Sequence, residues 1–423
     1  MRVLFNTFAA SSHLYPMVSV AWALHAAGHE VRVASQPDLV DTIVRTSLPA
    51  VPVGDPLDLA RQMQEDTSWR EEDSRAGDLR EVRPEKLTWD FVSGVQDWHL
   101  RNIFRHLNTN SVLDDIVAVA REWQPDLVLW DSMTFSGAVA ARACGAAHAR
   151  FLFGQDLIGR MRTGFLRLLA EQPAHLRHDP LADWLGEAVA RTGGTFAEDL
   201  VVGQWSLDAT VPWLRLDDTG LDYLPVRYVP YTGASPVPEW LPERPARPRV
   251  CLTAGLGGRE ITGEEWIPYS ELFDAVADLE VEVVATLSAD QLDPRTKLPD
   301  NVRIFDFYPL NVLLPTCSAV VHHGGSGAYA LALASGVPQL VISTELWWDA
   351  VDKAHALVDR EAAIFMEPSA LTGETLRENL IRLIEEPSFR AGAKRVQAEF
   401  NATPSPVDIV GHLERLTAAH RSR

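Results

Sequence analysis

Val320-Val-His-His-Gly-Gly-Ser-Gly327 joins the end of an apolar run to a glycine-rich turn. The apolar run 319–321 ends in two β-branched residues, which predicts the end of a buried strand. Residues 328–335 are mostly good helix formers, and Gly336 supplies the left-handed residue that commonly ends a helix. A strand, a glycine turn and a helix N-terminus predict a phosphate site, because free N–H groups and the positive helix end face the anion. A glycine-rich turn without a ligand, as in any α/β protein, is the alternative.

The length and charge of the chain limit its class and its partners. It has 423 residues, too many for one ordinary core, so we expect two domains. Its formal net charge of −20 disfavours nucleic acid and anionic membranes as partners over most of the surface. An anionic ligand must therefore be held by a local device, such as a helix terminus.

The cysteines and the distribution of apolar residues predict a cytoplasmic protein. Cys144, Cys251 and Cys317 are far apart and form no CxxC pair, which disfavours a zinc knuckle or a disulfide framework and fits a reducing cytosol. The first residues already read as a strand, so we expect no signal peptide. No run approaches about 18 apolar residues, so we expect no transmembrane helix.

A β-loop-α-β pattern occurs twice along the chain. It first appears as a strand at 3–8, a small-residue loop at 9–12, a helix at 17–27 and a strand at 30–34. It restarts at 249–253, which is followed by a second small-residue loop. Further strands are expected at 50–53, 125–130, 149–153, 281–287, 302–305 and 338–342, and helices at 95–107, 112–123, 136–144, 160–192, 269–279, 375–386 and 388–400. This alternation is typical of parallel sheets covered by helices.

Composition places the domain boundaries. Residues 228–249 contain six prolines and little periodicity, so 228–248 is the predicted linker. We predict two tandem, doubly wound, Rossmann-like domains at 1–227 and 249–405. A terminal helix at 406–423 is expected to cross back to the first domain. Within that domain, the polar part of the segment 55–123, near 65–80, is expected to be a mobile loop.

His13 and Asp131 are candidates for acid–base chemistry. Both follow predicted strands of the first domain, at the sheet edge where open α/β sheets bind ligands. A histidine there can act as a general base near neutral pH, and Asp131 could accept its N–H and fix the tautomer. A loop histidine and a surface acid without a role are the alternatives.

Asp349 is a candidate for binding sugar hydroxyls. It follows Trp348, just past the strand that comes after the glycine-turn helix. A carboxylate accepts from two hydroxyls, and an indole ring covers the apolar face of a sugar. A turn acid beside core aromatics is the alternative. No metal site is evident, and neither GxxxxGK[ST] nor a GxGxxG after the first strand is present, which disfavours NTPases and ordinary dinucleotide oxidoreductases.

The motifs together resemble those of natural-product glycosyltransferases with the GT-B fold, in which two Rossmann-like domains face a central cleft. The likeness runs essentially from end to end and is closest to the macrolide group that moves deoxysugars from dTDP donors to polyketide aglycones. It rests on His13, on the glycine turn and on the segments Gly28-His-Glu-Val31, Asp126-Leu-Val-Leu-Trp130, Gly203-Gln-Trp205, Val237-Pro-Glu-Trp240 and Phe305-Asp-Phe-Tyr-Pro-Leu-Asn-Val-Leu-Leu314.

The resemblance implies a role for each matching residue. His13 is similar to the base that deprotonates the acceptor hydroxyl, and Asp131 to its orienting partner. Asp349 is similar to the acid that contacts the donor hexose. The diphosphate site would comprise His322, Gly325, Ser326, Gly327, Gly255 and Leu256, and the nucleobase would stack on Phe307 beside the Tyr308 backbone.

Two departures from the family pattern concern the donor. Many relatives have Gln after the sugar-binding acid, whereas this chain has Ala350. UDP-using plant relatives have Glu where this chain has Ala330, and that Glu contacts the ribose diol. Because a deoxyribose has no 2′-hydroxyl and a deoxysugar has fewer hydroxyls, both departures favour a dTDP-deoxysugar donor.

The sequence therefore predicts an inverting, metal-independent hexosyltransferase that glycosylates a macrolide-type polyketide aglycone in antibiotic biosynthesis, with the dTDP-deoxysugar, including aminodeoxysugars, as co-substrate and no cofactor. The resemblance also implies an auxiliary activator similar to a cytochrome monooxygenase; the segment 55–123 would bind it or form an acceptor lid. A homodimer is left open. The alternatives are transfer to an aromatic polyketide or other lipophilic acceptor, a nucleotide-sugar epimerase, and a non-catalytic nucleotide-sugar-binding or auxiliary protein.

Overall fold

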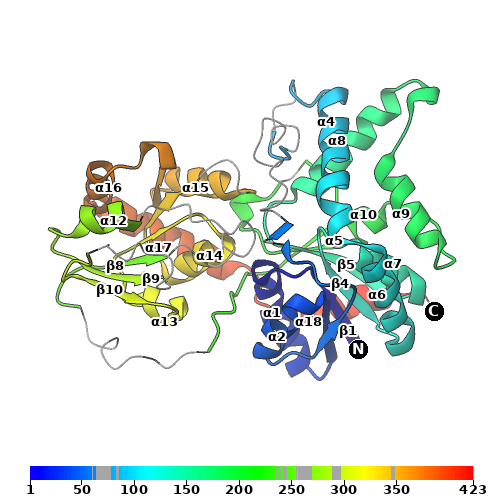
Figure 1. The fold of residues 1–423 in the computed structure, drawn as a ribbon, viewed down its shortest axis with the longest axis horizontal. Coiled ribbons are helices and arrows are strands. Elements are labelled where there is room, and N and C mark those ends of the chain that lie inside the picture. Colours follow the sequence, from blue (N-terminus) through cyan, green and yellow to red (C-terminus); the bar gives the residue numbers. More distant parts are fainter. Residues whose placement is uncertain are drawn as a thin grey trace. The chain divides into compact units, whose positions relative to one another are not determined.

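The chain folds into two compact units, seen in the computed structural model in Figure 1. The N-terminal unit comprises Met1–Thr210, Arg215–Tyr228 and Pro404–Arg423, and the C-terminal unit comprises Val211–Leu214 and Val229–Thr403. The structure describes residues 1–59, 61–62, 78–81, 85–216, 218–234, 237, 241, 245–253, 255, 269–287, 297–343 and 348–422. Most of the polar segment near 65–80, for which a mobile loop is predicted, lies outside these residues.

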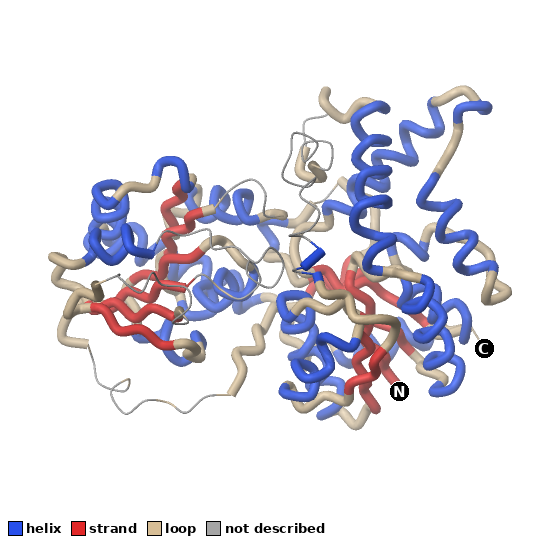
Figure 2. Tube along the Cα trace, in the orientation of Figure 1, coloured by secondary structure: helices blue, strands red, loops and turns tan. Residues whose placement is uncertain are grey.

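The N-terminal unit is built on one parallel sheet with the strand order β3-β2-β1-β4-β5-β6-β7. Every neighbouring pair of strands in it is parallel. Helices lie on both faces of the sheet (Figure 2). The strands are β1 (Arg2–Asn6), β2 (Glu30–Ser35), β3 (Ala50–Pro52), β4 (Leu127–Asp131), β5 (Ala147–Leu152), β6 (Ser206–Asp208) and β7 (Tyr223–Pro225).

Ten α-helices are described in this unit. The long segment from α4 to α5 contains one π-helical turn, Leu100–Phe104. The last helix, α18, packs against β5, so the C-terminal residues belong to the N-terminal unit. The helices are α1 (Ser11–Ala26), α2 (Val40–Arg45), α4 (Trp89–His99), α5 (Arg105–Leu107), α6 (Asn110–Trp123), α7 (Ser136–Cys144), α8 (Leu157–Glu171), α9 (Pro180–Ala190), α10 (Asp199–Val202) and α18 (Val410–His420).

The start of α1 differs from the prediction. The sequence predicts a loop at 9–12 and a helix from residue 17, but α1 already begins at Ser11. Its N-cap residue is Ala10, whose side chain cannot accept a hydrogen bond, so the usual polar signal of a helix start is missing. His13 therefore lies in the first turn of a helix and not in a loop.

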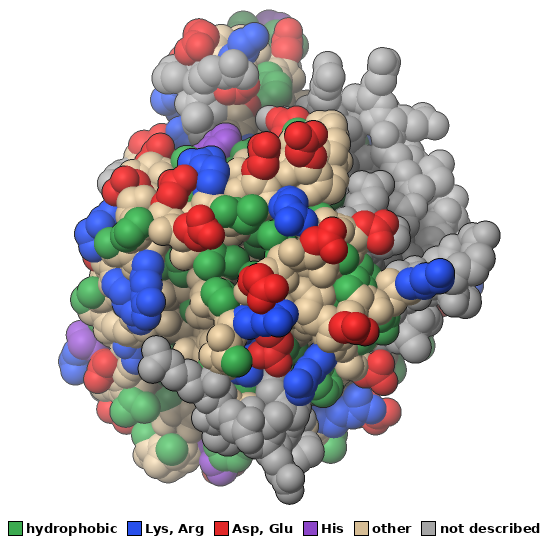
Figure 3. Space-filling view, turned by 90° about the vertical axis from the view of Figure 1, so that its left-hand side faces the viewer, with side chains coloured by type: hydrophobic (Ala, Val, Ile, Leu, Met, Phe, Trp, Pro, Cys, Tyr) green, Lys and Arg blue, Asp and Glu red, His purple; other side chains and the backbone are tan. Residues whose placement is uncertain are grey.

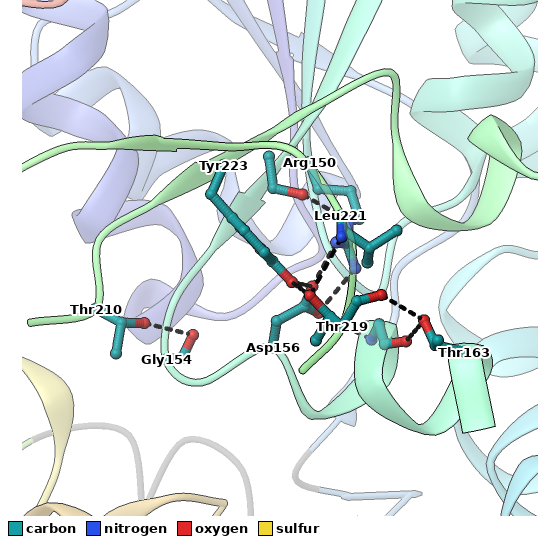
Figure 4. Close-up of polar contacts among 10 residues, drawn as sticks. Arg150, Gly154, Asp156, Thr163, Thr210, Thr219, Leu221 and Tyr223 are labelled. Carbon is teal, nitrogen blue, oxygen red and sulfur yellow. Dashed lines mark hydrogen bonds and ion pairs between the residues drawn. The ribbon is translucent and has the colours of Figure 1, made fainter. Parts of the chain in front are cut away.

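Strands β6 and β7 are not predicted, since each has only three residues. They are tied to β5 by a buried polar cluster, drawn in Figure 4. Arg150 of β5 donates to Asp156 Oδ1 over 2.8 Å and to Ser206 Oγ over 3.0 Å, and the hydroxyl of Tyr223 donates to Asp156 Oδ2 over 2.8 Å. Asp156 also caps α8 by accepting from Gly159 N. Hydrogen bonds among distant residues thus hold an edge of the sheet that has little apolar pattern.

The C-terminal unit has a second parallel sheet, with the strand order β10-β9-β8-β11-β12-β13. Its strands are β8 (Arg249–Thr253), β9 (Glu282–Thr286), β10 (Val302–Phe305), β11 (Ala319–His322), β12 (Gln339–Ile342) and β13 (Ala363–Met366). Its α-helices within the described residues are α12 (Tyr269–Val276), α13 (Leu310–Leu313), α14 (Ser326–Ser335), α15 (Ala350–Val358), α16 (Gly373–Glu385) and α17 (Pro387–Ala402).

Both faces of this second sheet are buried. Along β8, Val250 and Leu252 enter one core cluster together with Leu272 of α12. Cys251 points to the opposite face and enters a second cluster with Leu331 of α14. Alternate residues of a strand face opposite sides, so a strand covered on both sides is apolar throughout. This explains why the three central residues of β8, 250–252, are all apolar.

The two sheets share one topology. In each, the strand order reverses once, between β1 and β4 in the N-terminal unit and between β8 and β11 in the C-terminal unit. In open α/β sheets, ligands bind beyond the carboxyl ends of the strands at this point of reversal. The predicted fold class, two Rossmann-like parallel-sheet domains, is confirmed. The search for a site can therefore start at two places, one in each unit.

Charges of both signs are interspersed on the surface shown in Figure 3. Acidic and basic side chains alternate over the described part of that face, although the chain has a formal net charge of −20. Local arrangements of charge therefore matter more for binding an anion than the overall field does.

Candidate active site

His13 and Asp131 meet at the strand reversal of the N-terminal unit. Asp131 is the last residue of β4, and His13 lies in the first turn of the helix that follows β1. His13 Nδ1 lies 2.7 Å from Asp131 Oδ2. Asp131 Oδ1 accepts from Met133 N over 3.0 Å, so the carboxylate is held on both oxygens. The structure thus brings together the two residues that the sequence selects for base chemistry.

The pairing fixes which nitrogen of His13 can act as a base. A carboxylate accepts hydrogen bonds, so His13 Nδ1 carries the proton and Nε2 is left as the acceptor. The rings of Phe8 and Phe153 both contact the imidazole, each with its centroid 4.3 Å away. His13 is 7% exposed. The ring is therefore restrained by one hydrogen bond and two aromatic contacts.

The glycine turn lies at the strand reversal of the C-terminal unit. It connects β11 to α14, whose N-cap residue is Gly325 and whose first residue is Ser326. Gly325 has no side chain to accept from the first-turn N–H groups, which have no partner inside a helix. Gly324 adopts φ +89°, a left-handed conformation that favours glycine. Gly336 ends α14 with φ +63°, as predicted from the sequence. The turn has the form of an anion-binding helix terminus.

Both ring nitrogens of His322, a residue predicted at the diphosphate site, have partners within the protein. Its side chain is fully buried. His322 Nε2 lies 2.8 Å from Gln339 Oε1, and His322 Nδ1 accepts from Gly324 N over 3.0 Å. Because both ring nitrogens are engaged within the protein, direct contact with a phosphate would require breaking one of these bonds. The role of His322 at the diphosphate therefore stays a prediction; in the structure its ring holds the glycine turn through Gly324 N.

His323 lies between the two glycines predicted for the diphosphate site. A Cβ atom on Gly255 would lie 2.8 Å from His323 Cε1, and one on Gly325 would lie 2.8 Å from His323 Nε2. Neither glycine can gain a side chain without displacing this ring. The loop after β8 and the turn after β11 thus meet at His323. Leu256, the other residue predicted on the β8 side, lies outside the described residues.

The residues predicted for the nucleobase follow β10. Phe307 is 46% exposed, and its ring lies against Gly233, where an added Cβ atom would come within 2.9 Å of Phe307 Cζ. Tyr308 is buried in the core cluster of α13 and α14. An exposed aromatic ring beside a buried tyrosine is compatible with a base stacking on Phe307 and contacting the Tyr308 backbone.

Asp349 lies at the N-cap of α15 and is 2% exposed. Its Oδ1 lies 2.6 Å from Lys353 Nζ, one helical turn further on. The neighbouring Trp348 is half-buried and adopts φ +31°, which is uncommon for a residue with a side chain. The acid predicted to bind the sugar is thus a buried member of an ion pair, beside a strained tryptophan.

The residues of both units match one protein family. Residues 22–255 match the N-terminal domain of the Erythromycin biosynthesis protein CIII-like family, and residues 270–416 match its C-terminal domain. The chain belongs to this family. One relative is an aclacinomycin-T 2-deoxy-L-fucose transferase of Streptomyces galilaeus. It is 49% identical to this chain, and the match covers all of this chain and 97% of the relative. A 10-deoxymethynolide desosaminyltransferase of Streptomyces venezuelae is 46% identical over all of this chain and 98% of its own.

Solved structures of glycosyltransferases have the same fold. Glycosyltransferase VinC in complex with dTDP has a TM-score of 0.89 and 45% identity, covering 99% of this chain and all of its own. Spinosyn forosaminyltransferase SpnP has a TM-score of 0.83 and 42% identity, with 99% of each chain covered. This CIII-like protein is therefore a glycosyltransferase with the GT-B fold, and the resemblance seen in the sequence is confirmed.

Two features are absent from the described residues of this CIII-like protein. These residues contain no group of three or more His, Cys, Asp or Glu side chains that could hold a metal ion. None of their helices is both long and apolar enough to cross a bilayer.

Several residues that surround the site in this CIII-like chain are not predicted from its sequence. Phe8 and Phe153 are separated by more than a hundred positions and meet only on His13. The left-handed conformation of Gly324 depends on the path of the turn. The pairing of Lys353 with Asp349 could have been predicted from the sequence, because an acid and a lysine four residues apart on a helix commonly pair.

Buried histidines predict a pH-dependent stability for this CIII-like protein. Burial lowers the pKa of His322 from 6.5 to about 4, and burial also lowers that of His99 to about 4. Because the folded pKa lies below the unfolded one, this stability is complete above pH 6.5 and is lost as the pH falls towards 4. Each histidine would contribute roughly 3 kcal/mol.

The measurement is the melting temperature by circular dichroism between pH 7.5 and 4.5, with histidine C2 proton shifts followed by NMR. We expect the melting temperature to fall steadily below pH 6.5, and the His322 shift not to titrate before unfolding. A His322 signal that titrates near pH 6.5 in the folded protein would contradict the prediction.

Proposed function

We propose that this protein transfers a deoxysugar from a dTDP donor to a hydroxyl of a macrolide-type polyketide aglycone, in the biosynthesis of an antibiotic. The observation that carries the proposal is an identity of 41–49%, over the whole of this chain, to four relatives. These are named as a 2-deoxy-L-fucose transferase, two desosaminyltransferases and a mycaminosyltransferase. The glycosyltransferase VinC, solved with dTDP, supports the nucleotide. The paired His13 and Asp131 support catalysis over mere binding of a nucleotide sugar.

The proposed mechanism divides the chemistry between the two units. His13 Nε2 takes the proton of the acceptor hydroxyl as its oxygen attacks the anomeric carbon. The bond from that carbon to the diphosphate oxygen breaks on the opposite face, so the configuration inverts. The diphosphate leaves with the bonding electron pair, and the N–H groups at the start of α14 stabilise its growing charge. Asp131 stabilises the imidazolium that forms on His13.

The proposed donor follows from two small side chains. Ala330 is buried in α14, and Ala350 is buried at the start of α15, so neither position offers a polar group to a ribose or a hexose. A donor whose ribose lacks the 2′-hydroxyl and whose sugar has few hydroxyls would not need hydrogen-bond partners at these two positions. An aminodeoxysugar is included, because one relative is named as a desosaminyltransferase and another as a mycaminosyltransferase.

The acceptor has a second candidate class. The relative with 49% identity is named for aclacinomycin T, whereas the relative with 46% identity is named for 10-deoxymethynolide. The two named acceptors differ although the identities are similar. An aromatic polyketide or another lipophilic alcohol is therefore the second candidate for the acceptor.

The partners are also part of the proposal. We propose that the enzyme needs no metal and no cofactor besides the dTDP-sugar, and that it works in the cytoplasm without nucleic acid or membrane. An auxiliary protein similar to a cytochrome monooxygenase would bind the segment 55–123. Activity with and without the co-expressed auxiliary protein tests that contact, and light scattering tests whether the chain forms a homodimer.

The decisive experiment is one set of incubations read by mass spectrometry. The protein is mixed with dTDP-2-deoxy-L-fucose or dTDP-desosamine, in EDTA, and with aclacinomycin T or 10-deoxymethynolide. We expect a glycosylated product and release of dTDP only when an acceptor is present. Release of dTDP without acceptor, or an altered donor sugar, would replace the transferase by a hydrolase or an epimerase. If the protein bound dTDP but showed no turnover even with the auxiliary protein present, it would be a non-catalytic nucleotide-sugar-binding protein.

A further inference from the structure

Lys353 connects the glycine turn to the acid predicted to bind the sugar. It lies on α15 and is only 5% exposed. Lys353 Nζ lies 2.6 Å from Asp349 Oδ1 and donates to Ser326 Oγ over 2.7 Å. The same ammonium lies 5.6 Å from the centroid of the Tyr329 ring. One buried cation thus contacts the first residue of α14 and the N-cap residue of α15.

The place of this lysine is electrostatically costly for the folded protein. The N-terminus of a helix carries partial positive charge, so a cation is favourable at the other end. Lys394 of α17 shows the favourable arrangement: its Nζ donates to Ser335 O, at the C-terminal end of α14, over 3.4 Å. Lys353 instead adds its charge to the positive end of the same helix. A local rule broken at a buried position is commonly a sign of function.

The two histidines near this helix end add no positive charge at neutral pH. Burial, with the charge of Lys353 acting in the same direction, lowers the pKa of His322 and of His323 to about 4. Asp349 is the anion that faces the ammonium, and the Tyr329 ring packs beside it. Lys353 is therefore a charged donor at the start of α14.

The charge of Asp349 would repel the diphosphate of a bound donor. A carboxylate that binds sugar hydroxyls has to lie near the diphosphate to which the sugar is attached, and two anions repel each other in a buried site. Lys353 can reduce this repulsion, because its ammonium pairs with Asp349 and also contacts Ser326 at the proposed phosphate site.

We propose that Lys353 is a donor-binding residue: its ammonium offsets the charge of Asp349 against the diphosphate and contacts the diphosphate of the bound dTDP-sugar at the Ser326 end of α14. This inference rests on the proposed function. As the bond to the anomeric carbon breaks, the same ammonium stabilises the negative charge that grows on the departing diphosphate.

The test compares two lysine variants on two ligands. Lys353→Met removes the charge and keeps most of the length, and Lys394→Met is the matched control at the other end of α14. We expect Lys353→Met to weaken dTDP binding by about 10- to 100-fold, the range for losing a charged hydrogen bond, and to change thymidine binding by less than about twofold. Lys394→Met should change neither. A purely structural role would weaken thymidine and dTDP alike, which would overturn the inference.

A second pair of variants covers a folding defect. Lys353→Met leaves Asp349 buried without its cation, whereas Asp349→Asn combined with Lys353→Met leaves no unpaired buried charge. We expect the double variant to bind dTDP at least about tenfold more weakly than Asp349→Asn alone. Equal affinities for dTDP would overturn the inference. Failure of the proposed function would instead appear in the unaltered protein, which would show no turnover or would bind no dTDP.

Discussion

Replacement of His13 by alanine is expected to lower turnover by about 10²- to 10⁴-fold, the usual contribution of a general base. His13 belongs to the N-terminal unit, and the glycine turn and Phe307 belong to the C-terminal unit. The affinity for dTDP should therefore stay within about twofold of that of the unaltered protein. Turnover is measured under saturating donor and acceptor, and dTDP binding by calorimetry.

Two further variants sharpen the result for His13. Asp131→Asn keeps the shape of the pair but can present an N–H to Nδ1, which would leave the proton on Nε2 and remove the base. It should therefore lose most of the turnover that His13→Ala loses. His25→Ala changes an exposed histidine in the last turn of the same helix and should change neither measurement. Full turnover by His13→Ala would remove His13 from the mechanism.

The fold could be predicted from the sequence because most of it is repeated and local. The β-loop-α-β pattern starts twice, and parallel strands buried on both faces read as apolar runs, as β8 and β11 do. The edge of the first sheet could not be predicted. Strands β6 and β7 are short and are held by Arg150 and Asp156 together with Tyr223, which is 67 positions from Asp156. No periodicity records contacts of that kind.

The sequence could identify which residues form the candidate site, but it could not show how each of their side chains is oriented. His13, Asp131 and the glycine turn could be placed because each follows a strand that ends at a strand reversal. The orientation of His322 could not, since it depends on Gln339 of the neighbouring strand. A pair of adjacent histidines gives no sign of which ring faces inward. Hydrogen bonds across the sheet decide that, and they become visible only in the structure.

Gly324→Ala is expected to weaken dTDP binding by at least about 100-fold, which corresponds to about 2.7 kcal/mol. Two independent effects act on the turn. Gly324 adopts φ +89°, where a side chain costs about 1–2 kcal/mol. An added Cβ atom would also lie 2.9 Å from the Cβ of Ala350 and 3.4 Å from Val341 Cγ1. To relieve the overlap with Ala350 the turn must move away from the start of α15, and the N–H groups at the start of α14 move with it.

Gly28→Ala is the matched control, because Gly28 has the same φ of +89° and nothing within 4 Å of an added Cβ atom. It should lower the free energy of unfolding by about 1–2 kcal/mol through the backbone conformation alone. Its dTDP affinity should equal that of the unaltered protein, since Gly28 lies in the N-terminal unit. If both variants lost dTDP binding equally, the loss would reflect general destabilisation. If Gly324→Ala bound dTDP normally, the glycine turn would not be the diphosphate site.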